Sequence, residues 1–482
     1  MPGPGLAPFG DAPVTGLGLR ENPPLMAEAP SAPSSPASEQ GATDRLRTAA
    51  VRGGVLTMGG YVGAQGLRLL SNLVLTRLLF PEAFGLMALV NGFMTALQMF
   101  TDLGIRTSII SDKDGEAPRF LNTAWTLSVM RGAGLWLVSC ALAWPAARFY
   151  GQPQLLELLP VAGLQALILG FHSTASSALS RNLLLGRLTV IDLGVQAVAL
   201  LTMGLVAWRT ESVWALVVGG LTNAVLRTVL SHTVLPGVKN RFLWDREAAR
   251  KLIRFGRWIF ISTILTYVAD KSDRLILGAT MAIATLGVYN VAAFMAQAIQ
   301  DGLFILAQKV LLPLYARLAE VDAGGLRARI LRVRATLLLL TLPPLTVLVV
   351  FPDQVLRALY DDRYRDGAWM LQALAAGSLV GCLGVTATPV LLARGDSFRH
   401  MAVLAWRTLT LMVGLSWANA RWGVEGQVAA IALNPVLGYP AMAWATRAHG
   451  MWMPGLDALA LAGSALWLGL LLLIKAWLGW SP

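Results

Sequence analysis

Charged residues are scarce in this chain. Aspartate, glutamate, lysine and arginine together make up 14% of its 482 residues, whereas hydrophobic residues make up 55%. A soluble protein of this length would carry about a quarter of its residues as charged side chains. The composition therefore argues against a soluble enzyme and predicts an all-α polytopic membrane protein.

Cysteine and histidine are also rare, with 2 and 4 residues. Cys140 and Cys382 both fall within apolar segments and have neither disulfide nor metal spacing, and the histidines form no cluster. The sequence also lacks a P-loop of the Gly-x-x-x-x-Gly-Lys-Ser/Thr type, which excludes ATP hydrolysis by that route. We expect neither a cofactor nor a metal ion.

Acidic residues are fewer than basic ones, 27 against 39, which gives a net charge of +12. The basic residues are spread over short loops, so the charge does not indicate nucleic-acid binding. When the N-terminus is placed inside, the cytoplasmic loops carry more than twice as many lysines and arginines as the opposite loops. We therefore expect a cytoplasmic N-terminus.

Long apolar runs recur along the chain. A helix needs about 20 mostly apolar residues to cross the hydrocarbon core of a bilayer. This rule predicts thirteen membrane-spanning helices, a core of twelve plus one at the C-terminus. They are 53–79, 83–110, 122–147, 155–180, 186–208, 212–235, 255–279, 284–314, 333–351, 368–393, 399–419, 424–446 and 455–478.

The chain is expected to divide into five regions. The first, residues 1–48, is rich in Pro, Ala, Gly and Ser and lacks the apolar core of a signal peptide. We interpret it as a disordered cytoplasmic tail, with a translation start at Met26 as the alternative. The others are an N-terminal six-helix lobe at 49–235, a cytoplasmic amphipathic linker at 236–254, a C-terminal six-helix lobe at 255–450 and an additional C-terminal transmembrane helix at 451–482.

Polar side chains interrupt four of the apolar helices in stripes. Spacings of three, four and seven residues place each stripe on one helical face. Because a charge in lipid costs several kcal/mol, such faces must meet protein or water. The stripes are Tyr61, Gln65, Arg68 and Asn72; Asn91, Thr95, Gln98 and Asp102; Thr263, Thr266, Asp270 and Arg274; and Asn290, Gln297, Asp301 and Gln308.

The two halves of the chain resemble each other at an offset of 202 residues. This offset aligns Leu75–Met94 with Leu277–Ala296 without gaps and places Gly85 on Gly287. It also superimposes the helices that carry the stripes. An even number of helices per repeat gives parallel halves, related by an axis along the membrane normal. Two matched pairs of polar-faced helices indicate a translocation pathway between two halves.

Arginines and carboxylates in these stripes are the residues that could carry chemistry. Arg68 could bind an anionic head group through its guanidinium fork, or form a salt bridge with Asp270 or Asp102. Asp270 and Arg274 lie one turn apart and could pair with each other. Arg131 could face a cavity or extend to the cytoplasmic boundary.

Several motifs resemble those of the polysaccharide transporter family of the multidrug/oligosaccharidyl-lipid/polysaccharide (MOP) flippase superfamily. They occur in order over roughly residues 50–450. They are LTRLLFPEAFGL at 75–86, FTDLGI at 100–105, FLNTA at 120–124, SDRLILG at 272–278 and LGVYN at 286–290. The resemblance implies two six-helix bundles, with helices one, two, seven and eight lining a central cavity. The polar stripes lie on those four helices.

Membership of this family implies transport of polyprenyl-diphosphate-linked oligosaccharides across the bacterial inner membrane by alternating access. The cargo would serve exopolysaccharide, capsule or O-antigen synthesis, alongside a polymerase and glycosyltransferases as partners. The diphosphate would contact the basic residues Arg68, Arg131, Lys271 and Arg274, and the sugars would contact the polar residues Gln65, Asn72, Gln98, Gln297 and Gln300. An ion gradient could act through the carboxylates Asp102, Asp270 and Asp301, unless basic neighbours pair with them.

Two other functions stay open at this point. A cation-coupled multidrug exporter would belong to the same superfamily, but its cavity is expected to be acidic, whereas these stripes hold both signs of charge. A membrane polysaccharide polymerase or ligase would need a long external loop, and all expected loops have roughly 20 residues or fewer. Asp361 and Asp362 are the only loop pair that could serve as catalytic carboxylates, and a solvated acidic loop is the alternative interpretation.

Overall fold

The computed structural model describes residues 59–60, 63–101, 104–112, 114–181, 185–237, 239–270, 273–311, 314–315 and 323–478. The expected tail at 1–48 lies outside these ranges. Within them the secondary structure is helical, without a strand, as the composition predicts. Nine of the helices described are long and apolar enough to cross a membrane, which identifies a multi-pass membrane protein.

The helices of the first half follow the expected order. Residues 63–78 form a helix that precedes α2. Proline at the first helical position starts both α2 and α4, where its fixed φ suits the first turn. The elements are α2 (Pro81–Phe100), α3 (Ile105–Ser111), α4 (Pro118–Tyr150), α5 (Leu155–Gly170), α6 (Ala175–Arg181), α7 (Leu185–Thr210) and α8 (Trp214–Thr233).

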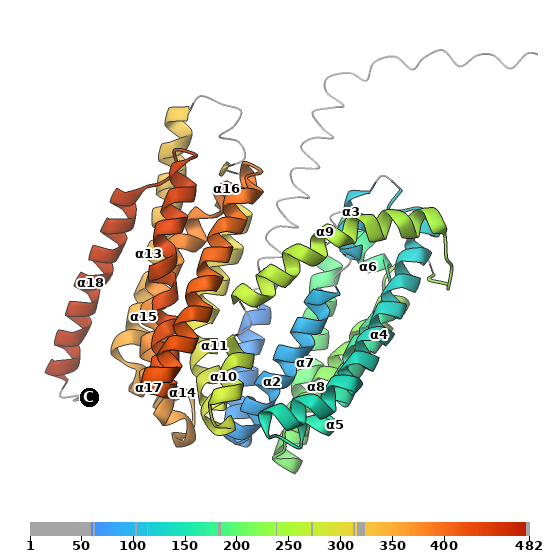
Figure 1. Cartoon of the computed structure of the whole chain (residues 1–482), viewed down its shortest axis with the longest axis horizontal. Helices are drawn as coiled ribbons and strands as arrows, with labels where there is room; N and C mark the ends of the chain where they lie inside the picture. Colours follow the sequence, from blue (N-terminus) through green and yellow to red (C-terminus); the bar gives the residue numbers. More distant parts are fainter. Residues whose placement is uncertain are drawn as a thin grey trace, which may run out of the picture. The chain divides into compact units, whose positions relative to one another are not determined.

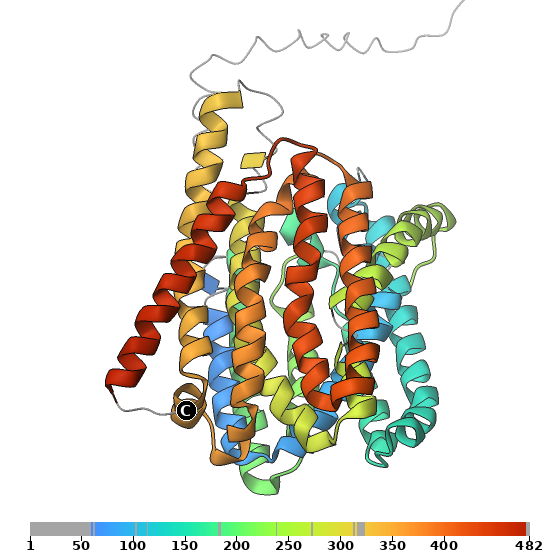
Figure 2. The ribbon, with the colours of Figure 1, turned by 60° about the vertical axis from the view of Figure 1, so that its left-hand side comes forward.

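The second half contains longer and more broken elements. The longest, α17, changes direction at Gly423, whose φ of +57° and ψ of −133° are not helical. This kink yields two arms that correspond to the predicted helices 399–419 and 424–446 (Figure 2). The elements are α9 (Arg246–Asp270), α10 (Asp273–Thr280), α11 (Ile283–Leu306), η1 (Ala307–Leu311), α13 (Ala323–Val350), α14 (Pro352–Leu359), η2 (Asp362–Gly367), α15 (Ala368–Ala387), α16 (Pro389–Ala393), α17 (Ser397–Arg447) and α18 (Pro454–Trp477).

The two halves meet where α2 and α11 cross in the centre of Figure 1. A Cβ atom on Gly85 would collide with the carbonyl oxygen of Ile283, and one on Gly287 would collide with the carbonyl oxygen of Pro81. The same 202-residue offset relates Gly85 to Gly287 and Pro81 to Ile283. The contact is therefore reciprocal: each half supplies one glycine and one carbonyl. It confirms that the sequence repeat reflects a structural one.

Helix α9 differs from the expected linker at 236–254. The amphipathic run is not a separate element, because α9 continues without interruption from Arg246 to Asp270. Ala248, Ala249 and Leu252 in its first turns are buried in a cluster with residues of α3 and α4. This packing explains why the helix begins early. Figure 1 shows α9 crossing the ends of the first-half helices, next to α3.

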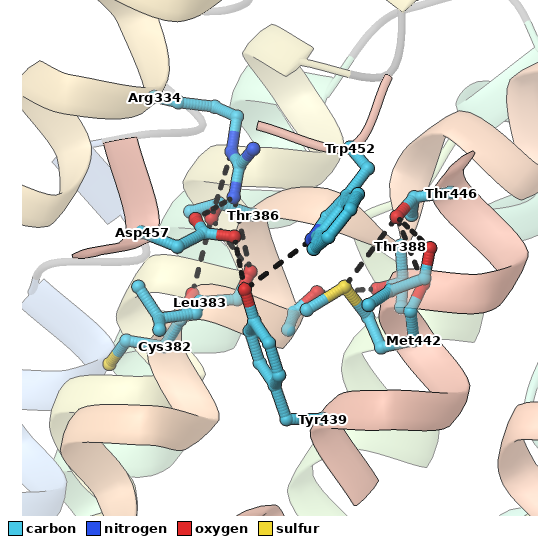
Figure 3. A network of polar contacts seen from close by, with 12 residues as sticks. Arg334, Cys382, Leu383, Thr386, Thr388, Tyr439, Met442, Thr446, Trp452 and Asp457 are labelled. Carbon is cyan, nitrogen blue, oxygen red and sulfur yellow. Dashed lines mark hydrogen bonds and ion pairs between the residues drawn. The ribbon is translucent and has the colours of Figure 1, made fainter. Parts of the chain in front are cut away.

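The C-terminal helix α18 packs against α13 and is tied to it by a buried ion pair (Figures 2 and 3). Arg334 Nη2 on α13 donates to Asp457 Oδ1 on α18 over 2.9 Å, with side-chain exposures of 0% and 3%. Tyr439 on α17 donates its hydroxyl to the second carboxylate oxygen over 2.9 Å, and Arg334 Nε donates to Thr386 on α15 over 3.3 Å. These bonds join α18 to α13 and α17, and they join α13 to α15.

Candidate functional site

The helices with polar stripes occupy the junction of the two halves. Figure 1 shows α2, α10 and α11 between the α4–α8 group and the α13–α17 group. Three polar side chains of these stripes are exposed on the first-half helices: Arg68, Asn91 and Gln98. Gln65 and Asn72 are half-buried. Tyr61, Asp102 and Lys271 lie outside the described residues, as do the side chains of Thr266 and Asp270.

Arg274, at the start of α10, is the centre of the second-half stripe. Its Nε donates to Asn290 Oδ1 over 3.3 Å, and its Nη2 donates to Gln297 Oε1 over 3.1 Å. Asn290 and Gln297 are seven residues apart on α11, so both amides face α10 from one side of that helix. The structure thereby brings together two of the predicted substrate-binding residues, Arg274 and Gln297.

The carboxylate that pairs with Arg274 is Asp273. Arg274 Nη1 and Asp273 Oδ1 are 3.4 Å apart, with side-chain exposures of 15% and 9%. Tyr289 donates its hydroxyl to Asp273 Oδ2 over 2.9 Å. Helical spacing predicts Asp270 as a partner of Arg274, and this stays a prediction because the Asp270 side chain lies outside the described residues. Asp273 was not among the predicted site residues, because adjacent residues of a helix do not face each other.

The guanidinium of Arg274 retains donor capacity. Arginine has five N–H groups, and the three contacts with described residues occupy one hydrogen on each nitrogen. Two N–H groups therefore remain for another acceptor. Because Asp273 compensates the buried charge and the two amides hold the plane of the guanidinium, the group is both stabilised and oriented. Such an arginine suits the oxygens of a phosphate or carboxylate.

Arg131 and Gln98 contact each other through the end of α2. Arg131 Nη2, on α4, donates to the backbone carbonyl of Gln98 over 2.7 Å, and its Nε donates to the Thr101 hydroxyl over 3.0 Å. A cation at a helix C-terminus satisfies carbonyls that have no partner within the helix. Arg131 therefore caps the C-terminus of α2. Its predicted role in binding substrate stays a prediction.

The polar residues of the first helix reach the second half at one point. Asn72 Oδ1 accepts a hydrogen bond of 2.8 Å from Tyr360, which lies between α14 and η2. Near it, Tyr364 donates to the carbonyl of Leu79 over 3.4 Å, and Arg363 donates to the carbonyl of Arg77 over 3.1 Å. These contacts lie at the same end as the Gly85–Gly287 crossing. Tyr360 carried no signal in the sequence, because its partner is 288 residues away.

Two other predicted residues, Gln300 and Asp301, follow Gln297 on α11. Gln300 Nε2 donates to the carbonyl of Ser378 over 3.1 Å, and its amide packs on Gly381, so it joins α11 to α15. Asp301, the next residue, is exposed. Among the described residues no group of three or more His, Cys, Asp or Glu is placed to hold a metal ion.

Asp361, one of the two acidic residues of the loop after α14, contacts Arg363 in the same loop. Asp361 accepts from the backbone N–H of Arg363 and forms an ion pair of 2.8 Å with its guanidinium, at the start of η2. The arginine holds the pKa of the Asp361 carboxyl below its ordinary value, so the group is charged at neutral pH. This arrangement favours the solvated acidic loop over a catalytic pair.

Comparisons with known proteins agree on one family and one fold. The model of a family described as "Polysaccharide biosynthesis protein" matches residues 74–368. The lipopolysaccharide biosynthesis protein WzxC of Escherichia coli K12 is 21% identical over 409 residues, which cover 81% of this chain and 81% of that protein. The succinoglycan biosynthesis transport protein ExoT of Rhizobium meliloti is 22% identical over 372 residues, which cover 76% and 73%.

Solved structures of membrane transporters share the fold. The lipid II flippase MurJ in an inward closed conformation superposes with a TM-score of 0.66 at 10% identity, covering 87% of this chain and 92% of that one. An inward-facing multidrug resistance MATE family transporter of the MOP superfamily gives a TM-score of 0.55 at 15% identity, covering 79% and 93%. These similarities confirm the predicted fold class.

Proposed function

Because this chain belongs to the polysaccharide biosynthesis protein family, we propose that it is a flippase for lipid-linked oligosaccharides that works by alternating access. The observation that carries the proposal is the Arg274 group, an oriented guanidinium at the junction of the halves with two N–H donors that no described residue occupies. WzxC and ExoT are named as polysaccharide biosynthesis and transport proteins, which supports the same cargo class. The protein would act as a transporter and not as an enzyme.

The polar stripes would bind the hydrophilic part of the cargo. The diphosphate of a polyprenyl-diphosphate oligosaccharide would contact Arg274 and the accessible Arg68, because arginine binds phosphate oxygens through paired N–H donors. Lys271 and Arg131 are proposed to add positive charge. The sugars would meet the amide side chains, which can donate and accept hydrogen bonds without selecting one sugar: Gln65, Asn72, Gln98, Gln297 and Gln300.

Alternating access needs an end that closes and opens. The Gly85–Gly287 crossing and the Asn72–Tyr360 bond join the halves at one end. In the orientation expected from the loop charges this would be the outer end, and we propose that these contacts close the pathway toward the outside. Release of the cargo outward would require α2 and α11 to separate there. An ion gradient acting through Asp102, Asp270 or Asp301 could drive this change.

The cellular setting follows from the same proposal. The protein would lie in the bacterial inner membrane with its N-terminus in the cytoplasm, and the polyprenyl tail of the cargo would stay in the surrounding lipid. A polysaccharide polymerase and glycosyltransferases would be its functional partners, since one consumes and the others produce the flipped unit. The glycan itself is set by those enzymes.

Reconstitution tests the proposal directly. Liposomes containing the purified full chain and a fluorescent polyprenyl-diphosphate oligosaccharide should expose inner-leaflet probe to an external quencher, whereas protein-free liposomes should not. Arg68→Ala should lower the initial rate at least about tenfold, since a charge-assisted bond contributes about 1.5–3 kcal/mol. Arg77→Ala, an exposed arginine on the same helix, is the matched control. Equal rates with and without protein would refute the function.

A further inference from the structure

A hollow lies beside the first turns of α9, away from the Arg274 group. It has a volume of about 480 Å³. Its lining comes from one short stretch of the chain: Trp244, Arg246, Ala249, Arg250, Ile253 and Arg254. Residues 246, 249, 250, 253 and 254 are three or four positions apart, so they occupy one face of the helix. Nothing in the transport proposal uses this face.

The basic residues in the first turns of α9 lie on two sides of the helix. Arg246, Arg250 and Arg254 line the hollow without a carboxylate among the lining residues. Lys251 is not in the lining and pairs with Asp114 over 2.7 Å. The lining of the hollow therefore carries three guanidiniums and no carboxylate, and it favours an anionic ligand.

Apolar groups complete the lining. Trp244 is 51% exposed and Ile253 is 49% exposed, although both are large and apolar. Ala249 forms the floor and is buried with Leu252 in the cluster that joins α9 to α3 and α4. A helix with arginines and exposed aromatic or aliphatic groups on one face is typical of the membrane interface. A small hydrated anion would leave Trp244 and Ile253 without an apolar partner.

We infer that this hollow binds the phosphate-bearing headgroup of an anionic lipid in the adjacent leaflet. The three guanidiniums donate to the phosphate oxygens, and Trp244 and Ile253 contact the glycerol and the first methylene groups. The lipid binds beside the transport pathway, and its binding does not depend on whether the chain flips an oligosaccharide. On the expected orientation this is the cytoplasmic leaflet, whose lipids include anionic phospholipids.

A binding titration on the full chain in neutral detergent tests this inference. Dioctanoyl phosphatidic acid is the probe, and microscale thermophoresis gives its Kd. The triple variant Arg246→Gln/Arg250→Gln/Arg254→Gln should raise this Kd at least about tenfold, since each basic residue near a lipid surface contributes about 1 kcal/mol. Dioctanoyl phosphatidylcholine, which has no net charge, should bind more weakly than phosphatidic acid to the unaltered protein.

A matched triple variant separates the site from general electrostatics. Arg327→Gln/Arg329→Gln/Arg332→Gln removes the same charge from exposed positions of α13 and should leave the Kd unchanged. An equal loss in both triple variants, or no loss in the first, would overturn the inference. Inorganic phosphate that binds as tightly as phosphatidic acid and depends on the same arginines would show a free-anion site and would also overturn it. Transport rates do not enter this test.

Discussion

Arg274 and Arg334, two arginines of the second half, have similar bonding partners but differ in burial and in the elements that they join. Each pairs with a carboxylate, Asp273 at 3.4 Å and Asp457 at 2.9 Å, and each carboxylate accepts a tyrosine hydroxyl. Arg334 is fully buried and binds groups on α15 and α18 (Figure 3). Arg274 keeps 15% of its side chain exposed and, among the described residues, binds groups on α10 and α11.

This comparison indicates that Arg334 forms a structural contact, whereas Arg274 is accessible to a ligand. The bonds of Arg334 connect elements that are far apart in the chain, so its loss should loosen the fold. The bonds of Arg274 are nearly local and hold one guanidinium in a fixed orientation, so its loss should mainly affect binding. Substitutions at both arginines and at two weaker contacts test this distinction.

Arg334→Met should give the largest loss of stability. The change leaves Asp457 buried without a cationic partner, and breaking a buried ion pair in this way costs about 3–5 kcal/mol. Unfolding in mixed micelles with increasing sodium dodecyl sulfate would measure it. The double variant Arg334→Met/Asp457→Leu should regain most of the loss, because no charge remains buried. A single variant as stable as the unaltered protein would contradict the structural role.

Arg274→Gln should reverse this pattern. The initial flipping rate in proteoliposomes should fall at least about tenfold, because a charge-assisted bond to phosphate contributes about 1.5–3 kcal/mol. Unfolding in the same micelles should change less than for Arg334→Met. Arg274→Lys keeps the charge but not the planar fork, and an intermediate rate is expected. A large stability loss with an unchanged flipping rate would show that Arg274 has a structural role like that of Arg334.

Gly287→Ala tests the contact between α2 and α11, the helix that carries the two amides bonded to Arg274. The added methyl group would meet the carbonyl oxygen of Pro81 and should destabilise the α2–α11 contact by about 1–3 kcal/mol. Gly302→Ala, on the same helix with no atom near the new Cβ, should instead be neutral or slightly stabilising. Thermal unfolding of both variants measures the contrast. Equal melting temperatures would show that the crossing tolerates a side chain.

Asp396→Asn should give the smallest effect, because its ion pair with Arg399 is partly exposed, in contrast to the Arg334 pair. The Arg399 backbone N–H and guanidinium, with His449, hold the pKa of Asp396 at about 2, below its ordinary value of 3.8. The stabilisation is therefore complete above pH 3.8 and disappears as the pH falls toward 2. The melting-temperature difference between Asp396→Asn and the unaltered protein should shrink over this interval. A difference that persists at pH 2 would contradict it.

The sequence predicted the helices well because each apolar run must satisfy its own backbone bonds in lipid. The repeat offset also placed Gly85 and Gly287 on equivalent positions, which the crossing confirms. The Asp270–Arg274 pair stays a prediction, whereas Asp273, which helical spacing did not favour, pairs with Arg274. Arg334 and Asp457 are 123 residues apart, and no local pattern could reveal that they meet.

Other differences have the same origin in long-range packing. Gln297 and Gln300 lie on the same helix and were assigned the same role, but only Gln297 bonds to Arg274. Gln300 bonds to α15, because a three-residue step rotates its side chain by about 60° from Gln297 around the helix axis. Tyr360 is a partner of Asn72 because the segment between α14 and η2 packs against the first half. Helix faces are readable from sequence, whereas the neighbour of each face is not.

The reciprocal glycine contact has a consequence for the ancestry of the chain. A surface in which residue i meets j while the equivalent of j meets the equivalent of i is self-complementary, the property that closes a two-fold dimer. The α2–α11 contact has this isologous form within a single polypeptide. Two copies of a half-length precursor could have docked through the same glycines, and gene fusion would then have allowed Arg274 and its counterpart Asn72 to diverge.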